Sequence, residues 1–302
     1  MNTFVPRYTL SDPELQNKQR TPVGAGSIVD DTYRLDERIA SGGMGVILRG
    51  RHLSMNRDVA VKLMHAHVAE KGDFVQRFRR EARVATLFNH PNITRVYDFG
   101  TTEDGIPYLV MELLDGEELQ DLLDRQGALS LGRTLDLAVD FLDGLAEAHS
   151  MEVVHRDLKP SNIFLSRTNR GREIVKLLDF GIAKLVDGQS TNVTQTGMVA
   201  GTASYVAPER LIGAHETYAM DVYSAGLIIL EMLMGRRVFD SDTVAQCLLM
   251  HLKKDATIPD RIARMPLGSV LRRATAKHPD DRYPDAGAFL DALTEVAPSC
   301  PR

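Results

Sequence analysis

Short β-like runs, separated by a glycine cluster and by polar turn residues, dominate the first part of the chain and predict an antiparallel β-sheet. Runs of this length bounded by turn residues are typical of strands. The segments are residues 33–40, 46–53, 58–64, 93–99 and 106–113. One helix is predicted between the third and fourth strands, because apolar residues recur at helical spacing after Asp73, a good N-cap residue. Residues 1–30 contain Pro6, Pro13 and Pro22 but no sustained periodicity, so we expect a flexible extension there.

Helical spacing replaces these short runs beyond Asp115-Gly116. One face of a long helix is formed by Leu131, Leu135, Ala138, Leu142, Leu145 and His149. Further helices are predicted for residues 220–234, 243–252, 267–276 and 286–296. The pattern indicates an α+β protein with two lobes, a small β-rich N-lobe at residues 31–114 and a larger, mainly helical C-lobe at residues 115–298. A cleft between two such lobes is a common place for a ligand.

The composition is that of an ordinary globular protein and excludes several classes. The chain has 302 residues, of which 43% are hydrophobic and 25% are charged. Its 36 basic and 41 acidic residues give a net charge of −5, which disfavours a general nucleic-acid partner. Cys247 and Cys300 provide neither a disulfide framework nor a zinc cluster. We expect a cytoplasmic protein, because the sequence shows no secretory signal and no membrane segment, which needs about 18 uninterrupted apolar residues.

A glycine cluster, Ser41-Gly42-Gly43-Met44-Gly45, separates the first two predicted strands. Glycines allow backbone N–H groups to approach a polyphosphate, although the same pattern is common in plain turns. The next strand carries Lys62 after three apolar residues, and a buried ammonium group needs an anion beside it. Glu81 on the predicted helix is one candidate partner. The alternative for Glu81 is a surface ion pair with an arginine of its own helix.

Two later motifs concentrate charged and amide groups. The first is His155-Arg156-Asp157-Leu158-Lys159-Pro160-Ser161-Asn162, which places a carboxylate, two cations and an amide in a Pro-containing loop. Such a loop suits phosphoryl transfer, in which positioning and charge neutralisation provide most of the catalysis. The second is Leu178-Asp179-Phe180-Gly181, which ends a predicted apolar strand at residues 174–178. Asp179 either binds Mg²⁺, which prefers oxygen ligands, or starts a turn.

In their order along the chain these motifs resemble those of the protein kinase family, in particular the bacterial, eukaryotic-like Ser/Thr protein kinases. The resemblance covers residues 33–296. It implies a bilobal protein kinase fold, one kinase domain over residues 31–298, and transfer of the ATP γ-phosphate to Ser/Thr hydroxyls of proteins. The cofactors it implies are ATP and Mg²⁺, or Mn²⁺ in its place. Lys159 and Gly201-Thr202 match the Ser/Thr-specific rather than the Tyr-specific branch.

The resemblance assigns catalytic roles to residues of the two dense motifs. Asp157 is expected to act as the catalytic base, which accepts the proton of the substrate hydroxyl or orients that hydroxyl. Lys159 would neutralise the transferring phosphate, and Asn162 and Asp179 would hold two Mg²⁺ ions. His155 has no chemical role in the family, where it is a packing residue.

The resemblance also outlines a nucleotide site. Its expected lining residues are Ile39, Ala40, Gly42, Gly43, Gly45, Ile47, Ala60, Lys62, Met111, Glu112 and Leu114. Lys62 would hold the α and β phosphates, and Glu81 would anchor Lys62. The C=O of Glu112 and the N–H of Leu114 would bind adenine, so side-chain identity should matter little at these two hinge positions. Ala40 replaces the first glycine usual in the family, and we expect modestly altered nucleotide affinity from it.

Three further matches favour a protein substrate. Glu209, in Ala207-Pro208-Glu209, and Arg282 match a family ion pair that pins the peptide-docking segment. Asp221 matches an aspartate that braces the backbone of the catalytic loop. The alternatives are a small-molecule kinase of related fold, which the Glu209 and Arg282 matches oppose, and a pseudokinase acting as a scaffold, which the filled catalytic positions oppose.

Control by phosphorylation is predicted from a polar segment that contains Thr191, Thr194 and Thr196. A phosphate adds a charge of about −1.5 to −2 at pH 7. We interpret Arg156 as an unpaired cation that can bind this phosphate. Our hypothesis is that autophosphorylation at Thr194 or Thr196, in a homodimer, orders the segment and raises activity; the alternative is a plain solvated loop. A helical arginine cluster is either a docking face or a solvated face. It comprises Arg77, Arg79, Arg80 and Arg83.

Overall fold

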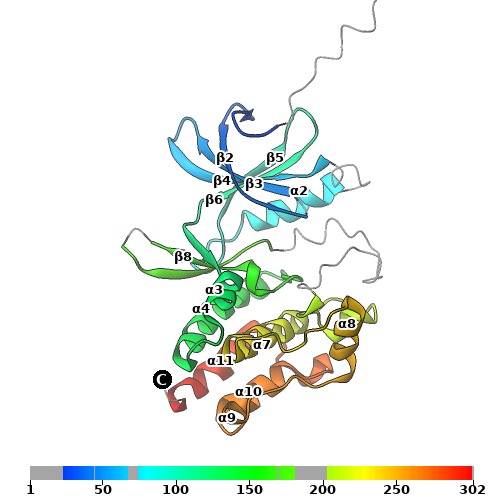
Figure 1. The fold of residues 1–302 in the computed structure, drawn as a ribbon. Coiled ribbons are helices and arrows are strands. Elements are labelled where there is room, and N and C mark those ends of the chain that lie inside the picture. Colours follow the sequence, from blue (N-terminus) through cyan, green and yellow to red (C-terminus); the bar gives the residue numbers. More distant parts are fainter. Residues whose placement is uncertain (1–22, 44, 67–73, 169, 181–202, 301–302) are drawn as a thin grey trace, which may run out of the picture.

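The computed structural model describes residues 23–43, 45–66, 74–168, 170–180 and 203–300. A twisted sheet with one helix beside it lies above a mainly helical region (Figure 1). The α+β architecture with two lobes that the sequence predicts is therefore confirmed. Thr194 and Thr196, for which we predict regulation, and Thr191 of the same segment lie outside the described residues.

Six antiparallel strands form the sheet of the N-lobe. In spatial order they are β1 (Ile28–Val29), β2 (Tyr33–Gly42), β3 (Gly45–His52), β4 (Arg57–Met64), β6 (Pro107–Glu112) and β5 (Val96–Thr101). Val59, Val61 and Leu63 alternate along β4 and share one core cluster, as expected of a strand with a buried face. The strand predicted for 93–99 begins later than expected, because Ile93 forms only an isolated bridge with Leu177.

The predicted N-lobe helix is α2 (Phe74–Ala85), which packs against the sheet. Phe74, Phe78 and Ala82 are fully buried at helical spacing and belong to a cluster with Met64 of β4. This spacing explains why the helix was predictable from apolar positions alone. Its bounds leave the expected N-cap Asp73 outside the described residues.

The predicted flexible extension is wrong for its last residues. Gly26 donates its N–H to Leu35 O at 2.8 Å, and Leu35 N donates to Ser27 O at 2.8 Å. Val29 is 3% exposed and belongs to the sheet core. Two residues are too few to show alternation, so β1 had no periodic signal in the sequence.

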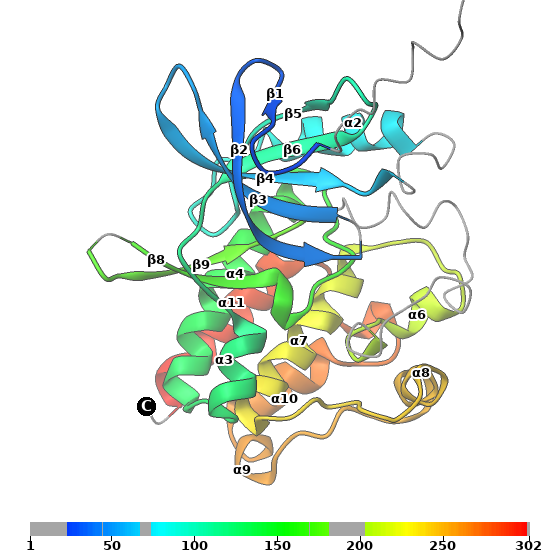
Figure 2. The ribbon, with the colours of Figure 1, turned by 45° about the horizontal axis from the view of Figure 1, so that its top comes forward.

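A second sheet lies between the lobes and carries two of the motifs. It consists of β7 (Gly116–Glu118), β8 (Ile163–Arg167) and β9 (Glu173–Leu177), all antiparallel. Only β9 was predicted. The 3-10 turn η2 (Pro160–Asn162) leads into β8, and Asp179 follows β9 by two residues. The strand β9 lies beside the long helix α4 (Leu131–Ser150) in Figure 2.

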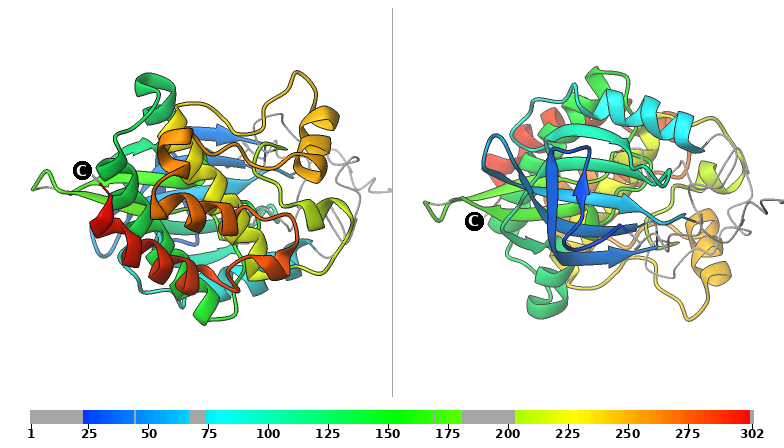
Figure 3. Two further views of the ribbon diagram at one scale, coloured as in Figure 1. Left: turned by 90° about the horizontal axis from the view of Figure 1, so that it is seen from below. Right: turned by 90° about the horizontal axis from the view of Figure 1, so that it is seen from above.

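The C-lobe is built around α7 (Tyr218–Met234), which is buried on nearly every side. The other helices are α3 (Leu119–Gln126), α6 (Pro208–Leu211), α8 (Val244–Lys253), α9 (Asp260–Ala263), α10 (Pro266–Ala274) and α11 (Ala286–Val296). Figure 3 shows α4, α7, α10 and α11 packed side by side. Gly235 ends α7 with φ 67°, a left-handed conformation that favours glycine. None of the helices in the described part of the chain has the length and apolar character needed to span a membrane.

Candidate active site

Lys62 of β4 and Asp179 after β9 join the two lobes in an ion pair. Lys62 Nζ lies 2.7 Å from Asp179 Oδ2, and the lysine side chain is only 8% exposed. Burial raises the pKa of Asp179, but the charge of Lys62 and its hydrogen bond lower it further, with help from His155 and Lys159, so the net pKa lies below the ordinary value. A charged carboxylate therefore stands where a cation can be held.

The expected ion pair between Lys62 and Glu81 does not form. Glu81 instead has its Oε2 3.9 Å from Arg156 Nη1 and its Oε1 3.5 Å from Arg80 Nη2. Lys62 pairs with Asp179 instead, so its buried ammonium group lies beside an anion. The sequence spacing shows which helix face Glu81 occupies, but it does not show how far α2 lies from β4. The roles of Lys62 and Glu81 toward a nucleotide stay predictions.

The motif at residues 155–162 gathers two of its functional groups around Asp157. Lys159 Nζ lies 2.8 Å from Asp157 Oδ2. Asn162 Nδ2 donates to the backbone O of Asp157 at 2.7 Å and approaches its Oδ2 at 3.3 Å. Leu178 N in turn donates to Asn162 O at 2.9 Å, which ties this loop to the residue before Asp179. The carboxylate of Asp157 therefore lies within hydrogen-bonding distance of both the ammonium group of Lys159 and the amide of Asn162.

Asp221, at the start of α7, accepts hydrogen bonds from the backbone of that loop. Its carboxylate accepts the N–H of His155 at 2.7 Å and that of Arg156 at 2.9 Å. Arg156 has φ 72°, a costly conformation for a residue with a side chain. Burial raises the pKa of Asp221, but His149, at 3.0 Å, and His155 lower it more, and the net pKa is below the ordinary value. His149 was not predicted, because a histidine on an apolar helix face gives no motif signal.

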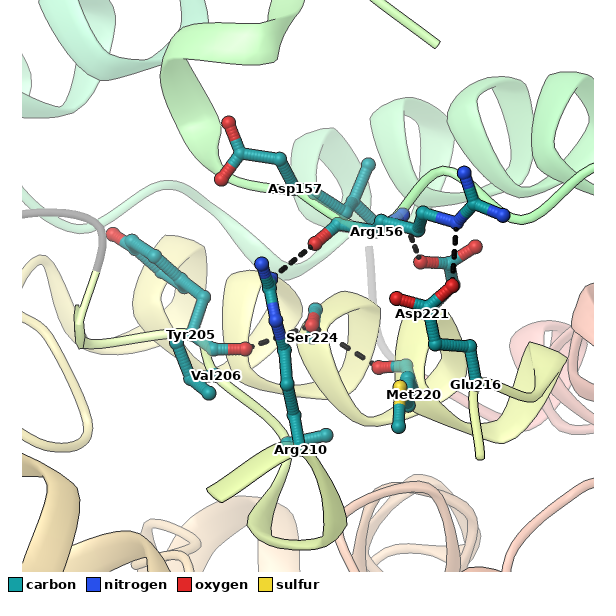
Figure 4. Close-up of a pocket in the computed structure, with 11 residues that line it drawn as sticks. Arg156, Asp157, Tyr205, Val206, Arg210, Glu216, Met220, Asp221 and Ser224 are labelled. Carbon is teal, nitrogen blue, oxygen red and sulfur yellow. Dashed lines mark hydrogen bonds and ion pairs between the residues drawn. The ribbon is translucent and has the colours of Figure 1, made fainter. Parts of the chain in front are cut away.

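The interpretation of Arg156 as an unpaired cation is wrong. Arg156 Nε lies 2.9 Å from Glu216 Oε2, and Arg210 Nη1 donates to Arg156 O at 2.7 Å. Figure 4 shows the side chain of Arg156 over Glu216 and Asp221, while that of Asp157 points in another direction. Glu216 belongs to no recognised motif, so no sequence signal singles it out.

The segment before α7 is held by two buried contacts. Arg282, 2% exposed, forms a bidentate pair with Glu209 at 2.6 and 2.8 Å and also donates to backbone carbonyls. Tyr205 donates its hydroxyl hydrogen to Glu231 at 2.5 Å, and burial raises the pKa of both groups. The Tyr205 contact was missed, because its two residues are separated by 26 positions in no recognised motif.

The glycine cluster forms the open end of the β2–β3 hairpin. A Cβ added at Gly42 or Gly43 would meet nothing within 4 Å, so the backbone there is accessible to a polyphosphate. A Cβ at Gly45 would lie 2.1 Å from Leu63 O, so Gly45 is required by strand packing. Four of the residues predicted to line the nucleotide site are paired across neighbouring strands. Ala40 of β2 lies opposite Ile47 of β3, and Ala60 of β4 lies opposite Met111 of β6. Ile39 is 52% exposed, and Leu114 is partly buried.

The oxygen donors near the cleft suit a hard divalent cation. Asp179 supplies a carboxylate and Asn162 an amide oxygen, the ligand types that Mg²⁺ prefers. Among the described residues no group of three or more His, Cys, Asp or Glu side chains converges on one point. Mg²⁺ commonly takes its remaining ligands from water and substrate phosphates. The residues present therefore fit an ion bound together with a nucleotide.

His155 packs against Phe180 with ring centroids 4.7 Å apart, and Phe180 packs against Phe88 of the N-lobe at 5.2 Å. His155 also contacts Leu178 O through Nε2 at 3.0 Å. Phe180, Met111 and Asp179 are among the residues that line a small cavity. These contacts are structural, and none brings His155 to a reacting group.

Comparison with known proteins identifies the family. The chain matches the protein kinase domain over residues 33–299. It is 39% identical over 265 residues to the serine/threonine-protein kinase Pkn1 of Myxococcus xanthus, covering 87% of this chain and 38% of that protein. It is 39% identical over 277 residues to PknA of Mycobacterium tuberculosis, covering 90% and 62%. A crystal structure of the PknI kinase domain of Mycobacterium tuberculosis aligns with a TM-score of 0.71 at 25% identity, over 92% of this chain and 100% of that one.

The chain belongs to the protein kinase family and has the protein kinase fold. The resemblance to bacterial, eukaryotic-like Ser/Thr protein kinases is confirmed by these relatives. The chain spans between 38% and 62% of the length of the curated relatives named here.

Proposed function

We propose that this protein transfers the γ-phosphate of ATP to Ser or Thr hydroxyls of protein substrates. The observation that carries the proposal is that Lys62 pairs with Asp179, that Asp157 contacts Lys159 and Asn162, and that a hydrogen bond from Leu178 N to Asn162 O links these two sets. Phosphoryl transfer asks the protein mainly for positioning and for neutralisation of charge, which these groups supply.

Each side chain has a role that its contacts support. Asp157 receives or orients the hydroxyl of the acceptor, and Lys159, 2.8 Å from it, is placed to neutralise the phosphate in transfer. Asn162 and Asp179 hold the divalent cation, for which we propose Mg²⁺, with Mn²⁺ as the alternative. When bound, the cation would neutralise the phosphate oxygens and orient them. Lys62 leaves Asp179 and binds the α and β phosphates.

The contacts of Glu81 support a resting state before catalysis. Glu81 is held near Arg156 and not beside Lys62, and Lys62 occupies Asp179. We infer that activation brings Glu81 to Lys62 and frees Asp179 for the cation. Phosphorylation of Thr194 or Thr196 would drive this change, because a phosphate competes with the carboxylates of Glu216 and Glu81 for Arg156. For this step we propose that two copies of the chain form a homodimer, in which each copy phosphorylates the other.

A protein acceptor is supported by the anchored segment before α7. The bidentate Glu209–Arg282 pair and the Tyr205–Glu231 bond hold this segment beside Asp157. A preorganised backbone at this place suits docking of an extended peptide next to the base. We also propose a cytoplasmic location and no nucleic-acid partner, in line with the net charge of −5.

The deciding experiment is incubation with ATP and Mg²⁺, followed by mass spectrometry. Phosphate on Ser or Thr, absent in Asp157→Asn and in Lys62→Met, supports the proposal. Nucleotide binding with no phosphate transfer to the protein or to added protein substrates would indicate a scaffold instead. Transfer only to a small molecule would indicate the small-molecule alternative.

A further inference from the structure

A partly buried ion pair connects the hinge to the strand that leads to Asp179. Lys176 of β9 has its Nζ 2.7 Å from Oε1 of Glu112, the last residue of β6. The lysine side chain is 14% exposed and the glutamate side chain 21% exposed. The prediction that side-chain identity matters little at the hinge concerns adenine binding through the backbone, and the side chain of Glu112 has this separate contact.

The same carboxylate also holds the neighbouring segment of the chain. Glu112 Oε1 accepts the N–H of Arg95 at 2.8 Å, and Glu112 N donates to Arg95 O at 3.0 Å. Lys176 Nζ approaches Ile93 O at 3.4 Å. The carboxylate, the ammonium group and segment 93–95 thus form one connected set of polar groups.

Segment 92–95 is bonded to β9 as well as to the hinge. Leu177 donates its N–H to Asn92 O at 2.8 Å and accepts the N–H of Thr94 at 2.9 Å. Asn92 Nδ2 donates to Val175 O at 2.9 Å. Two residues after Leu177 stands Asp179, the carboxylate proposed to hold the cation. Among the described residues, Lys176–Glu112 is the one ion pair that runs directly from hinge to β9.

We propose that Lys176 is a positioning residue that, through Glu112, fixes the adenine-binding hinge relative to Asp179. This inference rests on the proposed function. One nucleotide must meet the hinge with its base and the cation site with its phosphates, so the spacing of the two elements limits its affinity. A charge-assisted hydrogen bond between partly buried groups resists changes in that spacing better than a neutral one.

The test compares two ligands that share a base. Adenosine contacts the hinge alone, whereas ATP with Mg²⁺ needs the hinge and Asp179 together. In Lys176→Met we expect the Kd of ATP to rise about tenfold, the effect of losing one charge-assisted hydrogen bond, while that of adenosine changes less than about twofold. Lys176→Arg, which keeps the charge, should restore most of the ATP affinity. Calorimetry provides both constants without relying on activity.

The control is Arg133→Met, which breaks another ion pair of β9, that of Arg133 with Glu173 at the far end of the strand. It should leave both constants unchanged. If Lys176→Met does not fold, the variant with both Glu112→Gln and Lys176→Met leaves no unpaired charge and should show the same selective loss for ATP. Equal weakening of adenosine and ATP, or no weakening of either, overturns the inference. Failure of the wild type to transfer phosphate would overturn the proposed function. The Kd values of ATP and of adenosine would still test this inference, because they do not depend on activity.

Discussion

The Nε of Arg156 lies 2.9 Å from Oε2 of Glu216, so the arginine next to the proposed base is already bound to a carboxylate. The two side chains are 26% and 21% exposed. In Glu216→Gln the arginine loses a charged partner that competes with an incoming phosphate. We expect the gain in turnover that phosphorylation produces to rise up to about fivefold, since partly exposed pairs contribute about 0–1 kcal/mol. The ratio of turnover before phosphatase treatment to turnover after it measures this gain. An unchanged or smaller ratio would contradict the prediction.

Removal of both proposed phosphorylation sites should keep the enzyme in its resting state. In Thr194→Ala combined with Thr196→Ala, no phosphate is available to displace Glu216 from Arg156. We expect turnover toward an added protein substrate to fall by about tenfold or more, the scale of 1–3 kcal/mol couplings between regulatory and active sites. Thr191→Ala is the matched control and should retain activity. Full turnover in the double variant would dispose of this form of regulation.

Two glycines of the same loop should respond differently to alanine. At Gly45 the new Cβ would lie 2.1 Å from Leu63 O, so β3 and β4 must separate. Such overpacking typically costs about 1–3 kcal/mol of unfolding free energy. At Gly43 nothing lies within 4 Å of the added Cβ, and stability should hardly change. Thermal or urea unfolding of Gly45→Ala and Gly43→Ala checks the contrast, which equal stabilities would refute.

The Glu209–Arg282 pair should be costly to break because both side chains are buried. Removing one member, as in Arg282→Met, leaves a buried carboxylate without its partner and should lower the unfolding free energy by about 3–5 kcal/mol. Arg125→Met, which breaks an ion pair whose arginine is 54% exposed, should cost about 0–1 kcal/mol. Urea unfolding measures both. A loss in Arg282→Met as small as in the control would show that the pair contributes little.

Asp221 should contribute to the acid sensitivity of the fold. Its pKa in the folded protein lies below 3.8, the ordinary value, which the unfolded chain approaches. Between those two values the folded protein binds fewer protons than the unfolded chain, so the contribution of Asp221 is present above the unfolded pKa and is lost as pH falls through the folded one. The measurement is unfolding free energy against pH from about 2 to 6. Asp221→Asn should flatten the acid limb, and a limb as steep as in the wild type would count against this role.

Elements with a long periodic pattern were predictable. The helices α2, α4, α7 and α11 follow from apolar residues at helical spacing, and β2, β3 and β4 from short β-like runs bounded by turn residues. The strands β1 and β7 have two and three residues, too few for a period to appear. β8 directly follows η2 at the end of a dense motif, and its five residues were not recognised as a strand.

The order of the motifs along the chain established the family, because motif residues are local in sequence and need no coordinates. Which charged groups pair with one another was not predictable in this way. Lys62 pairs with Asp179, 117 positions away, and not with Glu81, while Arg156 pairs with Glu216 and Lys176 with Glu112. Ionic contact depends on a few ångströms of separation between elements that meet only on folding, and no spacing along the chain encodes that separation.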